Sequence, residues 1–309
     1  MSEAAKSKLP AAEGYEEFAA SWQPAIEAAL ENLLPAEDCD PRTLHRAMRY
    51  SIFPSGKRLR PVLALLAARA TGGSPERAMI PAVGLELLHT YSLIHDDLPC
   101  MDDDELRRGR PTCHKVFGEA LALLAGDGLL TLAFRAAADA GREAVKVLAD
   151  AAGSLGMVGG QVADLEAEGA GSAGTLPRLE FIHDRKTGAL ITASLELGAL
   201  AGGGQVDRKA LRQFGHLLGR AFQIADDCLD ETGSTEELGK RPGQDVAMAK
   251  LTYPALMGLE ASRKEAQRLA ESAARQASVV CGGAAPGSGL DLGQKLLQDA
   301  AFYAISRTR

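Results

Sequence analysis

The sequence contains two clusters of aspartates, and each follows an apolar stretch with helical spacing. The first is Asp96, Asp97 and Asp102, and the second is Asp226, Asp227 and Asp230. Asp226 and Asp230 are four residues apart, so they share one helix face, which Asp227 widens. Carboxylates at the end of a buried helix repel one another and oppose the helix dipole. The two clusters therefore predict a site for several Mg²⁺ ions that hold a polyanion, most simply a diphosphate.

The first cluster needs a break in its helix, because its last aspartate follows its first by six residues. In a straight helix, Asp102 would lie on the wrong face. Pro99 disfavours helical geometry in the preceding residue and cannot continue the hydrogen-bond ladder. We therefore expect the helix to end near Asp97 and a short loop to fold Asp102 back toward Asp96.

A solvated surface, a calcium loop and a phosphohydrolase site fit the acidic residues less well. A solvated acidic surface accounts for one cluster as readily as a metal site does, but it fits two such clusters poorly. A calcium loop of the EF-hand type requires a glycine at its sixth position and a glutamate at its twelfth, and neither is present. The His95-Asp96 pair is reminiscent of metal-dependent phosphohydrolases, but the further histidines of such a site are not evident among the six in the chain.

Two groups of cations accompany the aspartates: Lys57, Arg58 and Arg60 in the segment SGKRLRP, and Arg107, Arg108 and Arg110 in the segment LRRGRP. The first segment predicts a glycine-opened turn into a helix, where backbone N–H groups also favour an anion. In the second, adjacent guanidinium groups can bind different phosphates bidentately. No GxxxxGK[ST] pattern is present, which disfavours nucleoside triphosphate chemistry. With the aspartates, the cations predict two diphosphate sites, one held through metals and one held directly.

These motifs together resemble those of the trans-isoprenyl diphosphate synthases, and most of all the short-chain bacterial farnesyl diphosphate synthases. The resemblance rests on SGKRLRP, SLIHDDLPCMDDDELRRGRPTCHKVFGEALALLAGD, and FQIADDCLDETGSTEELGKRPGQD with KLTYPALMG. It implies an all-α fold, a single-domain bundle of roughly ten or more helices around a central cavity. Dimers are usual in the family. The composition agrees, since aromatics are only 5% and Ala, Leu and Glu, which favour helix, are abundant.

The resemblance also implies roles for individual residues. The metal ligands would be Asp96, Asp97, Asp102, Asp226, Asp227 and Asp230, with about three Mg²⁺ ions, or Mn²⁺ in their place. The allylic diphosphate would be bound by Arg107, Lys186, Thr187, Gln223, Lys240 and Lys250. Isopentenyl diphosphate would be bound by Lys57, Arg60, His89 and Arg108. Catalysis would depend on the first three aspartates and on Arg107, Lys186, Asp226, Asp227 and Lys250. Without the motif, His89 would be read as a core histidine.

The implied activity is the Mg²⁺-dependent head-to-tail condensation of isopentenyl diphosphate with dimethylallyl or geranyl diphosphate, a prenyltransferase reaction that yields farnesyl diphosphate. Tyr91 bears on the product length, because it lies about 7 Å deeper along the helix than Asp96. An aromatic ring there would end the cavity after few additions, unless it is ordinary core packing. A geranylgeranyl diphosphate synthase is the alternative. A terpene cyclase or phosphohydrolase is disfavoured because neither needs cations for a second diphosphate. A non-catalytic subunit is disfavoured because the metal and basic positions are all present.

Whole-chain properties exclude other classes. The net charge of −7 leaves no basic surplus for nucleic-acid binding. The five cysteines contain no CxxC pair, which favours a reducing compartment. The N-terminus lacks an apolar signal stretch, and no uncharged apolar run approaches the roughly 20 residues of a membrane span. We therefore expect a cytoplasmic protein with a single domain over residues 1–309, disorder over about 1–13 and a loose loop over about 281–289. The resemblance implies that it is a homodimer.

Overall fold

The computed structural model describes residues 14–53, 56–169, 173–205, 207–232, 250–283 and 288–306. Its elements are α1 (Tyr15–Leu33), α2 (Arg42–Ile52), α3 (Leu59–Ala70), α4 (Pro75–Asp96), β1 (Leu106–Arg107), β2 (Arg110–Pro111), α5 (Cys113–Phe117), α6 (Glu119–Ala138), α7 (Arg142–Ala152), α8 (Met157–Leu165), α9 (Leu176–His183), the π-helical turn η2 (Asp184–Gly188), α10 (Ala189–Gly202), α11 (Arg208–Thr232), α14 (Tyr253–Met257), α15 (Leu259–Val280) and α16 (Gly289–Ser306). The all-α prediction is confirmed, since the strands in the described residues form only one short antiparallel hairpin. The disorder predicted for residues 1–13 lies outside the described residues.

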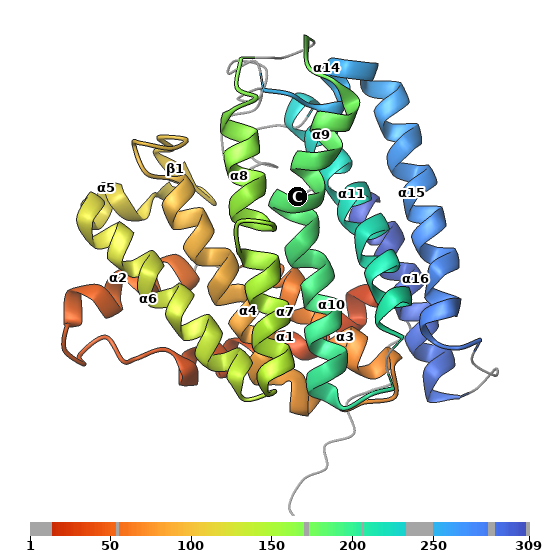
Figure 1. Cartoon of the computed structure of the whole chain (residues 1–309). Coiled ribbons are helices and arrows are strands. Elements are labelled where there is room, and N and C mark those ends of the chain that lie inside the picture. Colours follow the sequence, from red (N-terminus) through yellow and green to blue (C-terminus); the bar gives the residue numbers. More distant parts are fainter. Residues whose placement is uncertain are drawn as a thin grey trace, which may run out of the picture.

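Helices α3, α4 and α10 pack against one another in the middle of the bundle. Helix α3 is buried along nearly all of its length, as is α10, because both are apolar around most of their circumference. Figure 1 shows α5 and α6 at one side of these helices and α15 and α16 at the other, with the β1–β2 hairpin and α14 toward the upper end. The central helices therefore form a rigid frame, and the connections at the upper end are placed to carry a site.

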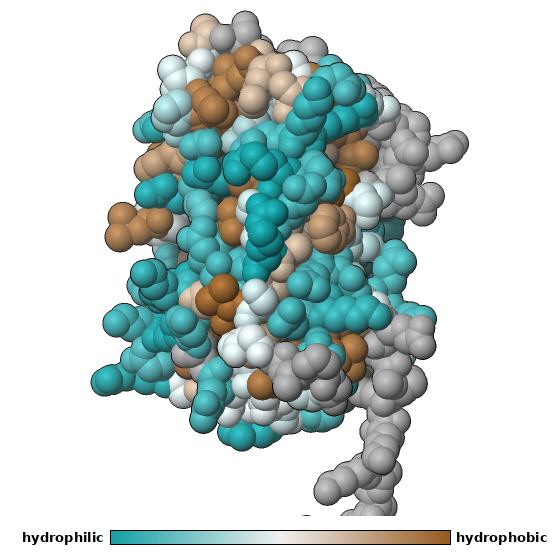
Figure 2. All heavy atoms as spheres, turned by 90° about the vertical axis from the view of Figure 1, so that its right-hand side faces the viewer, coloured by the Kyte–Doolittle hydropathy of each residue, from teal (hydrophilic) through white to brown (hydrophobic). Residues whose placement is uncertain are grey.

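The outer helices differ in the surfaces they present. Helix α15 is amphipathic, and Figure 2 shows that the face over it is largely hydrophilic. Helix α6 instead exposes Leu123 and Leu124, which are 46% and 51% exposed. Of the helices in the described ranges, α6 alone is long and apolar enough to cross a membrane by length and composition. One such helix is weak evidence for a membrane span, because the core helix of a globular protein passes the same test.

Breaks between the helices follow the glycines and prolines of the sequence. Helix α3 ends at Ala70, and α4 begins at Pro75 after Ser74, whose hydroxyl accepts a hydrogen bond from the Arg77 N–H. This is the helix start that a serine before a proline predicts. Near the C-terminus, α15 ends at Val280 and α16 begins at Gly289. Of the loose loop predicted for 281–289, residues 284–287 lie outside the described residues.

Candidate active site

The first aspartate cluster forms where α4 ends. The helix stops at Asp96, and Asp97 is its C-cap residue. The chain then folds back, and the backbone N–H of Asp102 donates a hydrogen bond of 2.9 Å to the carbonyl of Asp96. Asp103 follows with a φ of +49°, in the left-handed region. The prediction that the loop at Pro99 returns Asp102 to Asp96 is confirmed.

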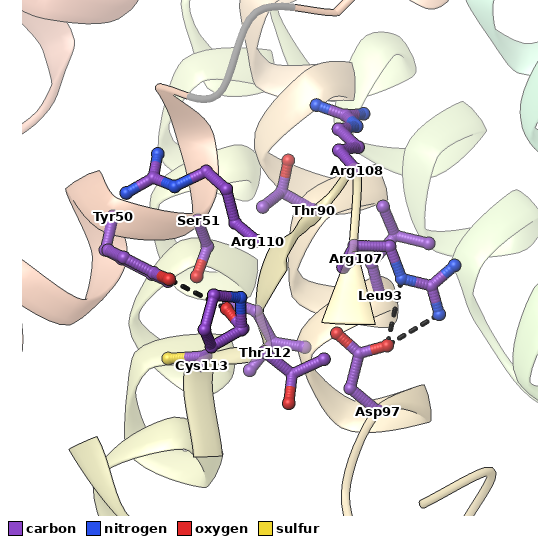
Figure 3. A pocket seen from close by; sticks show the side chains of 12 residues that line it. Tyr50, Ser51, Thr90, Leu93, Asp97, Arg107, Arg108, Arg110, Thr112 and Cys113 are labelled. Atoms are coloured by element: carbon purple, nitrogen blue, oxygen red, sulfur yellow. Dashed lines mark hydrogen bonds and ion pairs between the residues drawn. The ribbon is translucent and has the colours of Figure 1, made fainter. Parts of the chain in front are cut away.

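Asp96 and Asp97 face different cavities. Asp96 lines a central cavity of about 410 Å³ between α4, α8 and η2, together with Tyr91 and Lys186. Asp97 lines a small cavity beneath the hairpin, where its carboxylate accepts hydrogen bonds of 2.9 and 2.6 Å from Arg107 (Figure 3). Burial raises the pKa of both aspartates to about 6. The structure therefore aims Asp96 into the large cavity and pairs Asp97 with an arginine.

The hairpin separates the two neighbouring arginines. Arg108 and Gly109 occupy its two-residue turn with φ values of +54° and +74°, the left-handed geometry that such a tight turn requires. As a result, the side chains of Arg107 and Arg108 point apart (Figure 3). The guanidinium of Arg110 lies over the ring of Tyr50, 4.4 Å from its centroid. Arg107 and Arg108 can therefore bind different anions, as the sequence predicts, while Arg110 is engaged elsewhere.

The side chain of Arg58 points into the protein core, although the nearby Lys57 and Arg60 are predicted to bind isopentenyl diphosphate. Its side chain is fully buried and donates to Glu27 at 2.8 Å, to Glu86 at 3.0 Å and to the carbonyl of Ile52 at 2.8 Å. Its φ of +46° lies in the left-handed region directly before α3. Arg58 therefore anchors the SGKRLRP turn. Lys57, directly before Arg58, is exposed to solvent.

Of the residues predicted to bind isopentenyl diphosphate, two lie at the central cavity and Arg108 lines the small cavity beneath the hairpin. The two at the central cavity are Arg60 and His89. Burial, and then the positive charges of Arg60 and Arg108, hold the pKa of His89 well below its usual range. His89 is therefore neutral at physiological pH and can serve as a hydrogen-bond donor. Lys57 lies with its ammonium 5.4 Å from the ring centroid of Tyr303 in α16.

Lys186 and Thr187 come from the π-helical turn between α9 and α10, and both line the central cavity. The ammonium of Lys186 donates to Asp164 at 2.6 Å. Burial opposes the charge of Lys186, but the carboxylates of Asp164 and Asp96 raise its pKa above the ordinary value. Thr187 donates through its hydroxyl to Gln223 at 2.7 Å. Wide π-type turns recur at functional sites, and here one presents both side chains to the cavity.

The second aspartate cluster lies on α11 and is connected to the first. Gln223 donates to Asp227 at 3.2 Å, and the other oxygen of Asp227 accepts from the backbone N–H of Tyr253 at 3.0 Å. Three residues before Tyr253, the ammonium of Lys250 lies 3.8 Å from Asp102. The segment 250–253 therefore joins the two clusters. Asp226 and Asp230 lie on α11 with Asp227. Lys240, which is predicted to bind the allylic diphosphate, lies outside the described residues.

His183 lies beside Asp227 of the second aspartate cluster. Its ring stacks on Tyr253, with centroids 5.6 Å apart, and its Nε2 lies 3.6 Å from Asp227. Burial lowers the pKa of His183 to about 3, so the ring is neutral. The carboxylate of Asp227 thus has a backbone amide, a glutamine and a neutral histidine around it. Like Asp97, it is held by the protein more tightly than a freely exposed ligand.

The carboxylates suit a hard cation that arrives with its anion. Among the described residues, no three aspartate, glutamate, histidine or cysteine side chains converge closely enough to hold a metal ion by themselves. Mg²⁺ commonly keeps its waters and binds one or two carboxylates together with substrate phosphates. Burial, and with it the neighbouring charge of Asp102, raises the pKa of Asp96, and a bound cation would relieve the repulsion between the two carboxylates. Asp96 and Asp102 therefore fit Mg²⁺ bound with a diphosphate.

Sequence reasoning missed Asp164 and Gln161 on α8. Asp164 holds Lys186, and Gln161 lines the central cavity with a buried amide nitrogen that has no hydrogen-bond partner among the described residues. Both stand in the helix MVGGQVADL, which is otherwise apolar or glycine. The desolvation argument that singles out the aspartate clusters applies equally to a lone carboxylate in such a helix.

Comparisons with known proteins identify the family. The family model for polyprenyl synthetase matches residues 41–280. The chain belongs to this family. It is 48% identical over 263 residues to a heterodimeric geranylgeranyl pyrophosphate synthase large subunit of Arabidopsis thaliana, covering 81% of this chain and 70% of the relative. It is 46% identical over 261 residues to a geranylgeranyl pyrophosphate synthase of Capsicum annuum, covering 82% and 70%.

Solved structures of the polyprenyl synthetase family agree in fold. A geranylgeranyl pyrophosphate synthetase from Pyrococcus horikoshii has a TM-score of 0.81 at 31% identity, covering 95% of this chain and 99% of that one. An FPP/GFPP synthase from Zymomonas mobilis has a TM-score of 0.75 at 36% identity, covering 93% and 100%. The predicted membership of the trans-isoprenyl diphosphate synthases is confirmed. The protein is a prenyltransferase of the short-chain type, and the comparisons support chain elongation rather than a particular product.

Proposed function

We propose that the protein condenses isopentenyl diphosphate with allylic diphosphates in the central cavity, with Mg²⁺ as its cofactor. The observation that carries this proposal is the juxtaposition of Asp96, Asp102 and Lys186 beside a largely apolar cavity. Two carboxylates suit the metals, and Lys186 adds a direct contact to a diphosphate. Arg107, held beside Asp97, would contact the same group.

The residues around the cavity have different roles in the reaction. Bound Mg²⁺ would offset the negative charge that develops on the leaving diphosphate. Arg107, Lys186 and Lys250 stabilise the same charge from fixed positions, which is electrostatic catalysis. Apolar side chains such as Met157 and Leu165 exclude water from the allylic carbocation.

The second diphosphate belongs on the opposite side of the reacting carbons. Lys57, Arg60, His89 and Arg108 would hold isopentenyl diphosphate, so that its double bond attacks the allylic cation. The adduct then loses a proton to the released diphosphate, because the carboxylates near the cavity are committed to metals or cations.

For the product, we propose the twenty-carbon geranylgeranyl diphosphate first, because the relatives described above carry that name. The fifteen-carbon farnesyl diphosphate is the second candidate, favoured by Tyr91. Tyr91 is only 6% exposed and lines the cavity five residues before Asp96. Both candidates use the same chemistry and differ only in the number of additions.

A homodimer would cover the apolar face that α6 and α8 leave exposed. Leu123 and Leu124 on α6, and Val158 and Val162 on α8, are each between 44% and 51% exposed. A second copy of the chain is the simplest partner for this face. Light scattering would test it: a dimer mass that falls to the monomer mass in Leu124→Glu supports this face, and a wild-type monomer argues against it.

The activity is tested by incubating the protein with isopentenyl diphosphate, Mg²⁺ and dimethylallyl, geranyl or farnesyl diphosphate in turn. The products are dephosphorylated, and the chain length of each alcohol is measured. We expect Mg²⁺-dependent elongation from dimethylallyl and geranyl diphosphate. Consumption of farnesyl diphosphate would select the twenty-carbon product, whereas no incorporation of isopentenyl diphosphate from any starter would overturn the proposed function.

A further inference from the structure

His95 is a cavity residue to which the proposed function gives no role. Its ring lines the central cavity next to Asp96, and its side chain is 24% exposed. The Nε2 atom lies 3.0 Å from the backbone carbonyl of Leu123 on α6. A carbonyl only accepts hydrogen bonds, so Nε2 carries the proton and donates. The ring is thus attached to α6, although it belongs to α4.

The same ring forms one unit with Tyr91. The two ring centroids are 5.5 Å apart, and the rings meet edge to face at 88°. The residues are four apart on α4, so they lie one above the other on the face that borders the cavity. An apolar tail that extends along α4 from Asp96 would pass His95 first and Tyr91 next.

Gly126 on α6 provides the space in which His95 sits. A Cβ atom at position 126 would lie only 2.1 Å from Nε2, 2.4 Å from Cδ2 and 3.0 Å from Cε1 of the ring. No other residue type leaves room for the imidazole there. Glycine is also unfavourable in a helix interior, by up to about 1 kcal/mol relative to alanine. Its presence in the middle of α6 is therefore explained by the ring and not by helix stability.

We propose that Gly126 determines product length by setting how far His95 projects into the cavity. This inference rests on the proposed function, since it concerns the tail of the same allylic substrate. With a methyl group at position 126, the ring must move by at least about 1 Å to reach ordinary contact. Helix α6 blocks one side of the ring and Tyr91 another, so the displaced ring enters the cavity.

The expected size of the effect follows from how apolar pockets discriminate. A misfit of about one methylene changes relative rates by roughly 10- to 200-fold. In Gly126→Ala, the last addition of isopentenyl diphosphate should therefore slow by at least about tenfold relative to the previous one. The shorter intermediate should accumulate. Because the clash involves the end of a flexible side chain and alanine favours helix, the variant should remain folded.

The experiment measures the ratio of the longest product to the preceding intermediate for the full-length protein and four variants. Gly126→Ala should lower this ratio, and His95→Ala should raise it by enlarging the cavity. The double variant Gly126→Ala/His95→Ala should recover long products, since the displaced ring is gone. Gly128→Ala is the matched control, because its Cβ would meet Met48 on α2, at 3.1 Å from the sulfur, and not His95.

Two results would overturn the inference: a Gly126→Ala product ratio equal to that of the wild type, or a double variant no better than Gly126→Ala. If Gly126→Ala loses all turnover, the product ratio of His95→Ala tests the inference instead. An unchanged product length in His95→Ala rejects it. Failure of the wild-type protein to incorporate isopentenyl diphosphate rejects the proposed function instead. The two failures are therefore distinguishable.

Discussion

The buried ion pairs of Arg58 provide the sharpest test of how the cationic turn is built. Arg58 is fully buried, and Glu86 opposite is only 2% exposed, whereas Glu27 is 33% exposed and can be rehydrated. Replacing Arg58 with methionine leaves Glu86 buried without its hydrogen-bonded partner, and of the two arginines whose charges act on Glu86 only Arg108 remains. Removing one partner of such a pair typically costs about 3–5 kcal/mol of the free energy of unfolding. We expect Arg58→Met to lose stability in this range.

Two further variants separate the possible causes of that loss. Arg58→Met/Glu86→Met removes both charges, and apolar replacement of a buried pair is often neutral or stabilising. Most of the lost stability should therefore return. Arg263→Met removes one partner of an exposed pair, in which Arg263 and Glu260 are 51% and 78% exposed, and should cost less than about 1 kcal/mol.

The assay is urea denaturation followed by circular dichroism, with initial-rate kinetics on the same samples. The double variant should keep a raised KM for isopentenyl diphosphate and a normal KM for the allylic diphosphate, because the turn that carries Lys57 and Arg60 has lost its anchor. A loss below about 1 kcal/mol in Arg58→Met would refute the reasoning about burial. A normal KM for isopentenyl diphosphate in the double variant would refute the positioning role.

Three other perturbations probe the cavity. Tyr91→Ala should lengthen the product by at least one isoprene unit, and an unchanged product spectrum would remove Tyr91 as a limit on length. Asp226→Asn should lower kcat by about 10²-fold or more at saturating Mg²⁺, as the loss of an electrostatic contact in a closed site does; wild-type turnover would refute the metal assignment. Burial raises the pKa of Asp96 to about 6 in the unliganded protein, so protons compete with the metal below that pH. Mg²⁺ affinity, measured by calorimetry, should be constant above about pH 7 and should fall as the pH drops through 6.

The fold and the first aspartate cluster were predictable because local rules decide them. Helical periodicity and the glycine breaks indicated the helices, and Pro99 indicated the loop that returns Asp102 to Asp96. The hairpin was not predicted, since two residues per strand leave no alternating pattern. Arg110 and Arg108 look equivalent in the sequence, and only the turn of the hairpin sends one to Tyr50 and the other toward the SGKRLRP segment.

The roles of individual charges depended on burial, which spacing does not report. Arg58 carries the same charge as Arg60 two residues later, yet one is an internal anchor and the other lines the cavity. Asp97 and Asp227 were grouped with the metal ligands. Asp97 accepts hydrogen bonds from an arginine, and Asp227 accepts one from a backbone amide. Their metal roles stay predictions.

The π-helical turn at 184–188 amounts to one extra residue in an otherwise continuous helix from Leu176 to Gly202. Deleting a residue there would restore a regular helix and rotate α9 by about 100° relative to α10. The buried side chains of Leu179 and Ile182 would then turn toward solvent. A chain one residue shorter here would have to repack the upper end of the bundle. The length of this segment is therefore constrained by the packing of α9, apart from any role of the lysine it carries.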